Sequence, residues 1–201
     1  GLPGLADILK GADADALETI VVDLGSGERA TGINPATYDF RAAATEPAAS
    51  DALDQAEDVA GIGRRPHFAP AYLVRNGGKL ALLVLPVYGK GYQSTIHAYL
   101  ALSADLESVA ALSIYEQGET PGVGTRITDP AWLSLWQARQ IHDDEGGIVI
   151  AVVRGSASAP HEVDGISGAT RSTTGVSNLV RFWLGDKGFG PFLARMKSGG
   201  T

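Results

Sequence analysis

The segment DGISGATRSTTG, residues 164–175, crowds hydroxyl groups and glycines into one short stretch. Five of its twelve residues are serine or threonine, and three are glycine. Free backbone N–H groups and the positive end of the helix dipole make a helix N-terminus receptive to anions. The segment therefore suits either a phosphate group or a simple helix cap, and the residues alone leave the two readings open. Its position at a helix start follows from the apolar residues that come next at helical spacing: Val176, Leu179, Val180, Trp183 and Leu184, with Gly185 as the stop.

A second loop, GETPGVG at 118–124, combines three glycines with a proline, a carboxylate and a hydroxyl. It follows a predicted strand that ends near Tyr115. Such a composition indicates a tightly specified turn, which taken alone favours a structural loop over a binding site.

Several other catalytic patterns are absent or weak. No G-x-S-x-G elbow, phosphate loop or H-E-x-x-H helix occurs, and Ser167 has no base at a recognisable spacing. HDDEGG at 142–147 could hold a divalent ion, but a solvated turn is the stronger interpretation. The chain has no cysteine, which excludes disulfides, zinc–thiolate sites, iron–sulfur clusters and thiol catalysis.

Length and charge indicate one globular domain over residues 1–201. The net charge of −7 argues against nucleic acid as a partner. No apolar run is long enough to span a membrane, and no signal peptide is recognisable.

The elements that must position these loops are mostly strands. Residues 5–28 predict a short helix and then a strand near 18–24, and AYLVRNGGKLALLVLPV predicts a hairpin that turns at Asn76-Gly77-Gly78. Ser50 is expected to cap a helix over 51–63, and NPATYDFRAAATEP, which is polar and broken by Pro35 and Pro47, is expected to lie at the surface. Further strands are predicted for STIHAYLALS, SVAALSIYEQ and GIVIAVVRG, and Asp129-Pro130 opens a short helix with Trp132, Leu135 and Trp136 on one face. Because the connections are too short for crossover helices, the expected class is α+β, an antiparallel β-sheet with packed helices.

The two loops together resemble a known family. SGAT is the flavinylation motif of FMN-binding domains, and the wider pattern resembles the NqrC family, which belongs to the Na+-translocating NADH:quinone reductase (Nqr). The likeness extends over nearly the whole chain. It is carried by NPATYDFRAAA, AGIGRRPHFAPAYLVRN, VYGKGY, IYEQGETPGVG, DGISGATRSTTGVSNLVRFWLG and GFGPFL.

The resemblance implies a role for each matching residue. Thr170, which ends SGAT, would carry FMN through a phosphoester bond made by a flavin transferase. Asp164 would belong to the pattern that this transferase recognises, together with the SGAT residues Ser167, Gly168, Ala169 and Thr170. Ser167, Gly168 and Ala169 would also surround the phosphate. The remaining predicted cofactor contacts are Glu119 and Thr120, with Gly122 and Gly124 shaping their loop, and Lys90 at the edge of the pocket.

The resemblance also implies an assembly. The chain would be an electron-carrier subunit of a sodium-transporting oxidoreductase, relaying electrons from an iron–sulfur centre to the flavin of a membrane subunit. Its partners would be the other Nqr subunits, and the isolated domain is expected to show no turnover. The domain would lie on the periplasmic side of the bacterial inner membrane, and the full-length protein would be anchored by one N-terminal transmembrane helix.

One departure from the family stands out. The family commonly has Leu-Trp where this chain has Tyr92-Gln93, so a tryptophan contact with flavin or a neighbouring subunit is not expected there. Three alternatives remain open: the FMN-bearing subunit of an Rnf-type complex, a module that binds phosphate or a nucleotide reversibly, and a structural subunit in which SGAT is only a cap.

Overall fold

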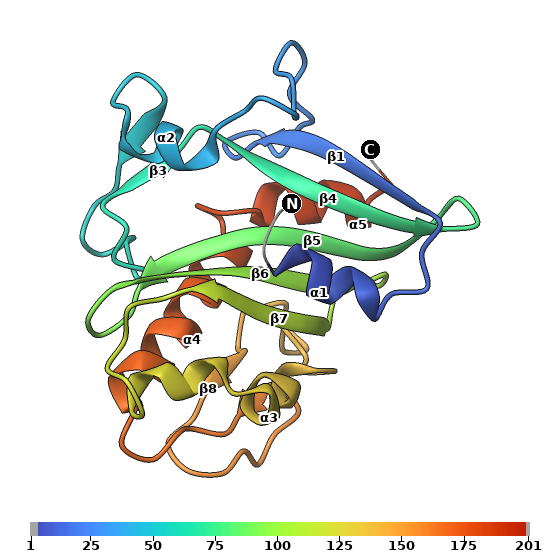
Figure 1. The fold of residues 1–201 in the computed structure, drawn as a ribbon. Helices are drawn as coiled ribbons and strands as arrows, with labels where there is room; N and C mark the ends of the chain where they lie inside the picture. Colours follow the sequence, from blue (N-terminus) through green and yellow to red (C-terminus); the bar gives the residue numbers. More distant parts are fainter. Residues whose placement is uncertain (1–3, 200–201) are drawn as a thin grey trace.

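The computed structural model describes residues 4–199 and is built on a five-stranded antiparallel sheet in the order β1-β4-β5-β6-β7 (Figure 1). Its strands are β1 (Ala16–Asp23), β4 (Phe68–Asn76), β5 (Lys79–Lys90), β6 (Thr95–Ser103) and β7 (Val109–Glu116). Two small sheets pair β2 (Ser50–Ala52) with β3 (Arg64–Pro66) and β8 (Ala151–Val152) with β9 (Glu162–Val163). The predicted class, α+β with an antiparallel sheet, is confirmed.

Five α-helices and two 3₁₀ turns complete the described part of the chain. They are α1 (Leu5–Lys10), α2 (Phe40–Thr45), η1 (Gly124–Thr128), α3 (Pro130–Leu133), η2 (Ser134–Trp136), α4 (Thr170–Leu184) and α5 (Gly190–Lys197). Between residues 4 and 199, no helix is both long and apolar enough to cross a bilayer.

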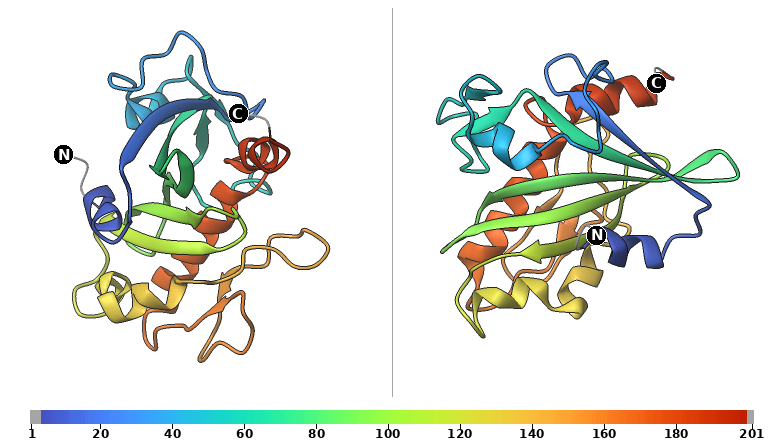
Figure 2. Two further views of the ribbon diagram at one scale, coloured as in Figure 1. Left: turned by 90° about the vertical axis from the view of Figure 1, so that its right-hand side faces the viewer. Right: turned by 45° about the horizontal axis from the view of Figure 1, so that its top comes forward.

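The sheet separates into two halves beyond the β4–β5 turn. β4 and β5 pair only as far as Tyr72 and Val84, after which β4 continues beside β1 and β5 beside β6. Pro86 lies in the part of β5 that no longer faces β4, so its missing N–H interrupts no bond to that strand. The divergence bends the sheet strongly, as the left view of Figure 2 shows.

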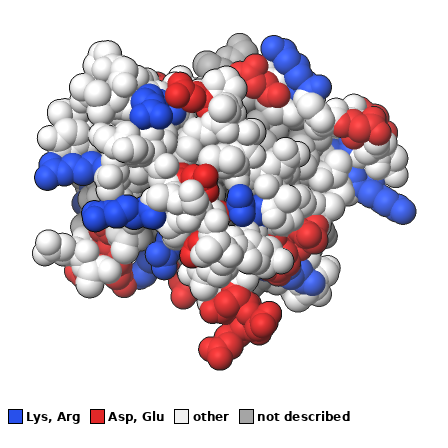
Figure 3. All heavy atoms as spheres, turned by 90° about the horizontal axis from the view of Figure 1, so that it is seen from below, with Lys and Arg blue, Asp and Glu red and all other residues white. Residues whose placement is uncertain are grey.

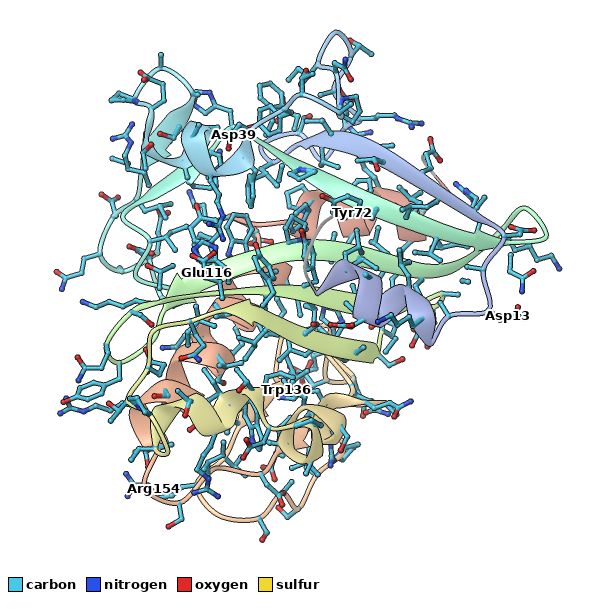
Figure 4. All side chains as sticks on the ribbon, in the orientation of Figure 1. Asp13, Asp39, Tyr72, Glu116, Trp136 and Arg154 are labelled. Carbon is cyan, nitrogen blue, oxygen red and sulfur yellow. The ribbon has the colours of Figure 1, made fainter. Side chains whose placement is uncertain are left out.

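Helices cover both faces of the sheet (Figure 2). On one face, Leu5 and Ile8 of α1 pack with Tyr72, which is labelled in Figure 4. On the other face, α4 and α5 close the main core, where Trp183 and Phe189 are fully buried. Successive strand residues point to opposite faces, so the alternation read from the sequence supplies both clusters.

Helix α4 crosses the end of β5 at very short range. The indole Nε1 of Trp183 donates a hydrogen bond to the carbonyl oxygen of Tyr88, 2.7 Å away. A Cβ at Gly89 would lie 2.7 Å from the Cβ of Leu179, and one at Gly175 would lie 2.7 Å from the carbonyl oxygen of Lys90. Two glycines therefore allow the helix and the strand to touch, and this contact fixes the first turn of α4 beside the β5–β6 loop.

Two local predictions are wrong. No helix forms over 51–63, because the Asp58 carboxylate accepts hydrogen bonds from the amides of Ile62 and Gly63 and turns the chain. Ser50 starts β2 instead, and its hydroxyl donates to the carbonyl of Glu46. A helix does form where none was expected: Asp39, labelled in Figure 4, caps α2.

The predicted strand in GIVIAVVRG is reduced to the two residues of β8, which pair with β9 in parallel. The helix after Asp129 begins at Pro130 as predicted but converts to a 3₁₀ turn after one turn. Trp136, labelled in Figure 4, is fully buried beside Trp132 below the sheet.

Candidate functional site

Thr170 is the first residue of α4 and is exposed at the rim of a cavity. Its hydroxyl makes no hydrogen bond within residues 4–199. Ala169 precedes the helix without a side-chain cap, so the first amides of α4 have no side-chain acceptor. A threonine hydroxyl and uncapped helix N–H groups thus occur at the same helix start, which is an arrangement that suits a phosphate.

The adjoining cavity has a volume of about 510 Å³. That is within the range of about 300–1,000 Å³ typical of cofactor pockets. The first two turns of α4 form one wall, and the segments 58–61 and 90–92 form the others. Its lining residues are Asp58, Val59, Ala60, Gly61, Lys90, Gly91, Tyr92, Thr170, Arg171, Thr174, Gly175 and Asn178.

Cations border the cavity even though the protein as a whole is acidic. Lys90 and Arg171 line it, and the guanidinium of Arg126 donates a hydrogen bond to the carbonyl of Ser167, 3.1 Å away and three residues before Thr170. Viewed from below, Lys and Arg side chains lie on both sides of the molecule with Asp and Glu among them, and several are on the left, the side where Figure 1 places the start of α4 and the β5–β6 loop (Figure 3). Asp58 lines the cavity as well, but its two oxygens are occupied by backbone amides. The local charge therefore favours an anionic ligand.

The remaining hydroxyls of the 164–175 segment divide into two groups. Ser172 and Thr173 are buried: the first donates to Glu119, and the second bonds back to the carbonyls of Ala169 and Thr170. Ser167, Thr170 and Thr174 are exposed. Two of the hydroxyls in this segment therefore stabilise the fold, and the three exposed ones are accessible to a ligand.

Of the other residues expected near the phosphate, Ser167 and Gly168 lie in the turn before α4. Gly168 has a φ of +83°, a conformation that favours glycine. Asp164 lies further back, and its carboxylate accepts a hydrogen bond from the amide of Ala157, 2.7 Å away. The 164–170 pattern therefore forms one ordered, partly exposed surface segment.

The GETPGVG loop packs behind the cavity. Glu119 is only 3% exposed, while Thr120 and Gly122 are at the surface. Gly124 is buried, and a Cβ there would lie 2.7 Å from the Ser172 hydroxyl. Of the predicted cofactor contacts and attachment residue, Thr170 and Lys90 line the cavity. The others are not among its lining residues: Ser167, Gly168, Ala169, Glu119, Thr120, Gly122 and Gly124.

Sequence reasoning missed part of the lining. Thr174 and Asn178 follow Thr170 at intervals of four, so helical spacing could have placed them on the same face. The sequence of residues 58–61 contains no such periodic pattern. These residues line the cavity because the Asp58 carboxylate accepts hydrogen bonds from the amides of Ile62 and Gly63 and turns the chain there. Arg171 and Tyr92 were also not assigned, yet the guanidinium carbon of Arg171 lies 4.8 Å above the Tyr92 ring.

The alternative metal site receives no support. No group of three His, Cys, Asp or Glu side chains that could hold an ion occurs between residues 4 and 199. Asp143 of the HDDEGG segment instead accepts hydrogen bonds from the amides of Glu145 and Gly147, as in a solvated turn.

Similarity to known proteins decides the family. The FMN-binding domain family matches residues 91–185. The NqrC protein of the Na+-translocating NADH-quinone reductase from Pseudomonas aeruginosa is 45% identical over 184 residues, which is 89% of this chain and 70% of the relative. Its counterpart from Yersinia pestis is 42% identical over 198 residues, 97% of this chain and 74% of the relative. The chain belongs to the NqrC family of the Na+-translocating NADH-quinone reductase.

Solved structures of the NqrC family share the fold. The crystal structure of Shewanella oneidensis NqrC superposes with a TM-score of 0.86 at 35% identity, covering 96% of this chain and 88% of that one. The structure of the equivalent protein from Parabacteroides distasonis gives 0.67 at 25% identity, covering 88% and 77%. The chain is therefore an FMN-binding subunit of this membrane complex, as the resemblance indicated.

The cavity beside Thr170 fits the FMN that the NqrC family implies. Three of its lining residues are glycines, and a Cβ at Gly175 would come within 2.9 Å of the Gly91 Cα, so the α4 wall and the 90–92 wall approach as closely as the backbone allows. Uncapped helix amides and two cations suit a phosphate. Apolar groups of Val59, Ala60 and Tyr92 suit the flat ring system.

Replacing Gly175 with valine is expected to push α4 away from β5. The added carbon atoms would meet the Lys90 carbonyl oxygen at 2.7 Å and the Gly91 Cα at 2.9 Å, and both are backbone atoms that cannot rotate away. Overpacking of this kind costs about 1–3 kcal/mol of unfolding free energy. Urea denaturation checks the value against Thr174→Val, an exposed neighbour on the same helix, which is expected to stay close to the wild type.

Proposed function

We propose that this protein holds its FMN covalently, as a phosphoester of Thr170 made by a flavin transferase, and relays electrons with it. The observation that carries the proposal is the exposed, unbonded Thr170 hydroxyl at the uncapped start of α4, on the rim of the FMN-sized cavity. Esterification there would leave phosphate oxygens close to helix N–H groups and to Arg171.

The chain's own residues would bind and orient the cofactor. The start of α4, Lys90 and Arg171 would neutralise the phosphate and negative charge on the ring, and the 58–61 wall would limit water. FMN supplies the electron-transfer chemistry when bound, and no side chain has to act as an acid or base. Because attachment holds the cofactor, one ring edge can stay exposed, as an electron carrier requires.

The proposal includes a place in the reductase. Electrons would arrive one at a time from an iron–sulfur centre and leave to the flavin of a membrane subunit. The domain would lie on the periplasmic side of the inner membrane. The sequence relatives of the Nqr type support this assembly over an Rnf-type complex.

The test is the mass of the denatured protein after co-production with an active flavin transferase. We expect a gain equal to one FMN less one water, and fragmentation should locate that gain on Thr170 rather than on Ser172, Thr173 or Thr174. A protein that binds flavin yet loses it on denaturation would instead support the reversible binding module. A gain located on another hydroxyl would contradict the assignment.

A further inference from the structure

We propose that Glu119 is a positioning residue for flavin attachment: without touching the cofactor, its carboxylate holds together two of the walls of the Thr170 cavity, the β5–β6 loop and the first turn of α4. The inference rests on the proposed function and assigns a different task to a residue that the sequence placed against the flavin.

The Glu119 side chain is buried and completely engaged. Its residue is 3% exposed, and its carboxylate accepts hydrogen bonds from five donors. All five donors are uncharged: the amides of Tyr92, Gln93 and Ser94 at 3.0 Å each, the Ser94 hydroxyl at 2.8 Å and the Ser172 hydroxyl at 2.5 Å. A buried carboxylate without a cationic partner is costly unless such donors satisfy it, so these bonds are essential to keep the charge there.

The donors come from two segments that form adjoining walls of the cavity, which meet where Gly175 lies against Lys90 and Gly91. Tyr92 and its neighbours belong to the β5–β6 loop, whereas Ser172 lies in the first turn of α4, two residues after Thr170. Glu119 itself comes from a third segment, after β7. One side chain thus joins three stretches that are far apart in the sequence, directly behind the predicted attachment site.

The surrounding glycines fit around this carboxylate. A Cβ at Gly91 would lie 2.6 Å from Glu119 Oε1, and a Cβ at Gly124 would lie 2.8 Å from the Glu119 Cβ. Without those glycines the carboxylate could not reach both walls. The Arg171 guanidinium lies over the Tyr92 ring, and both residues line the cavity, so this pair bridges the same two walls. Glu119 behind the cavity and the Arg171–Tyr92 pair together fix the distance between these walls.

Glu119 remains charged at neutral pH. Burial by itself would raise the pKa of Glu119, but hydrogen bonds from Ser172, Ser94 and the loop amides outweigh it and hold the pKa below its ordinary value. A glutamine at this position has nearly the same shape but replaces one accepting oxygen with an amide group that only donates. It would leave some of the five donors without an acceptor and release the loop from the helix.

The experiment compares Glu119→Gln with the wild type in two measurements. In the flavin-free protein, amide hydrogen exchange at residues 92–94 should become about tenfold faster or more, while exchange in β4 stays unchanged. In flavin transfer by the purified transferase, kcat should fall about tenfold with little change in KM, because residues 164–170 are still recognised but Thr170 is less well oriented.

Two further variants make the test specific. Ser172→Ala removes one donor while leaving the charge, and it should give a smaller change of the same kind if Glu119→Gln does not fold. Glu116→Gln is the matched control: Glu116, labelled in Figure 4, is exposed, pairs with Arg41 at 2.7 Å and lies outside the cavity, so it should change neither measurement.

The outcomes separate the two proposals. Faster exchange with unchanged kcat would overturn the positioning role and leave Glu119 as a purely structural group. Unchanged exchange in both Glu119→Gln and Ser172→Ala would also overturn it. No transfer to the wild type, with the transferase active on a control protein, would overturn the proposed function and the positioning role together.

Discussion

Substituting alanine for Thr170 is expected to abolish covalent flavin and to leave the fold intact. The hydroxyl is exposed, it makes no hydrogen bond within the described residues, and alanine is well tolerated in the first turn of a helix. The unfolding free energy should therefore change by less than about 0.5 kcal/mol. The mass of the denatured protein, measured after exposure to the transferase, should equal that of the unmodified chain.

Two matched variants test whether the Thr170 hydroxyl itself is the acceptor. Thr170→Ser keeps a hydroxyl and should still gain the mass of FMN less one water. Thr174→Ala removes an exposed hydroxyl from the same cavity, one helical turn further on, and should also still gain it. A mass gain in Thr170→Ala, or its loss in Thr174→Ala, would show that the attachment site has been misassigned.

The second large effect is expected at Trp183, which should destabilise the protein by about 4 kcal/mol when replaced with alanine. The side chain is fully buried, with the rings of Tyr88, Phe182 and Phe40 at 5.2, 5.4 and 5.6 Å. Its indole N–H also bonds to the Tyr88 carbonyl. The substitution removes both the packing and the tie between α4 and β5. Urea denaturation followed by circular dichroism measures the loss.

Two comparisons divide this loss into its parts. Trp183→Phe keeps an aromatic ring but not the hydrogen bond, so it should cost clearly less than the alanine variant. Leu17→Ala is the surface control, because Leu17 is 47% exposed, and its change should stay within about 0.5 kcal/mol. A loss below about 1 kcal/mol for Trp183→Ala would contradict the role of this residue as an anchor of α4.

The regular part of the fold was predictable because its signals are local. Two apolar runs on either side of Asn76-Gly77-Gly78 predicted the β4–β5 hairpin, and apolar residues at helical spacing predicted α4 with its end at Gly185. The region between β1 and β4 was not predictable in the same way. Asp39 and Asp58 both accept hydrogen bonds from backbone amides, but Asp39 caps a helix whereas Asp58 closes a turn. The sequence alone does not distinguish these two roles of an aspartate.

The site was predictable to a similar degree. The position of Thr170 at a helix start followed from hydroxyls and glycines beside an apolar pattern, and the family resemblance supplied the cofactor. The burial of Glu119 did not follow, because it depends on three segments that meet only in the folded chain. The 58–61 wall was missed for the same reason.

The exposure of Thr170 has a consequence for the order in which the protein matures. An acceptor hydroxyl at the surface of a finished fold can be modified without any unfolding. In the proposed function, folding therefore comes first and loading follows as a separate, enzyme-dependent event. A cell short of flavin would accumulate properly folded but redox-silent copies, so cofactor supply would set how many copies transfer electrons without changing how many exist.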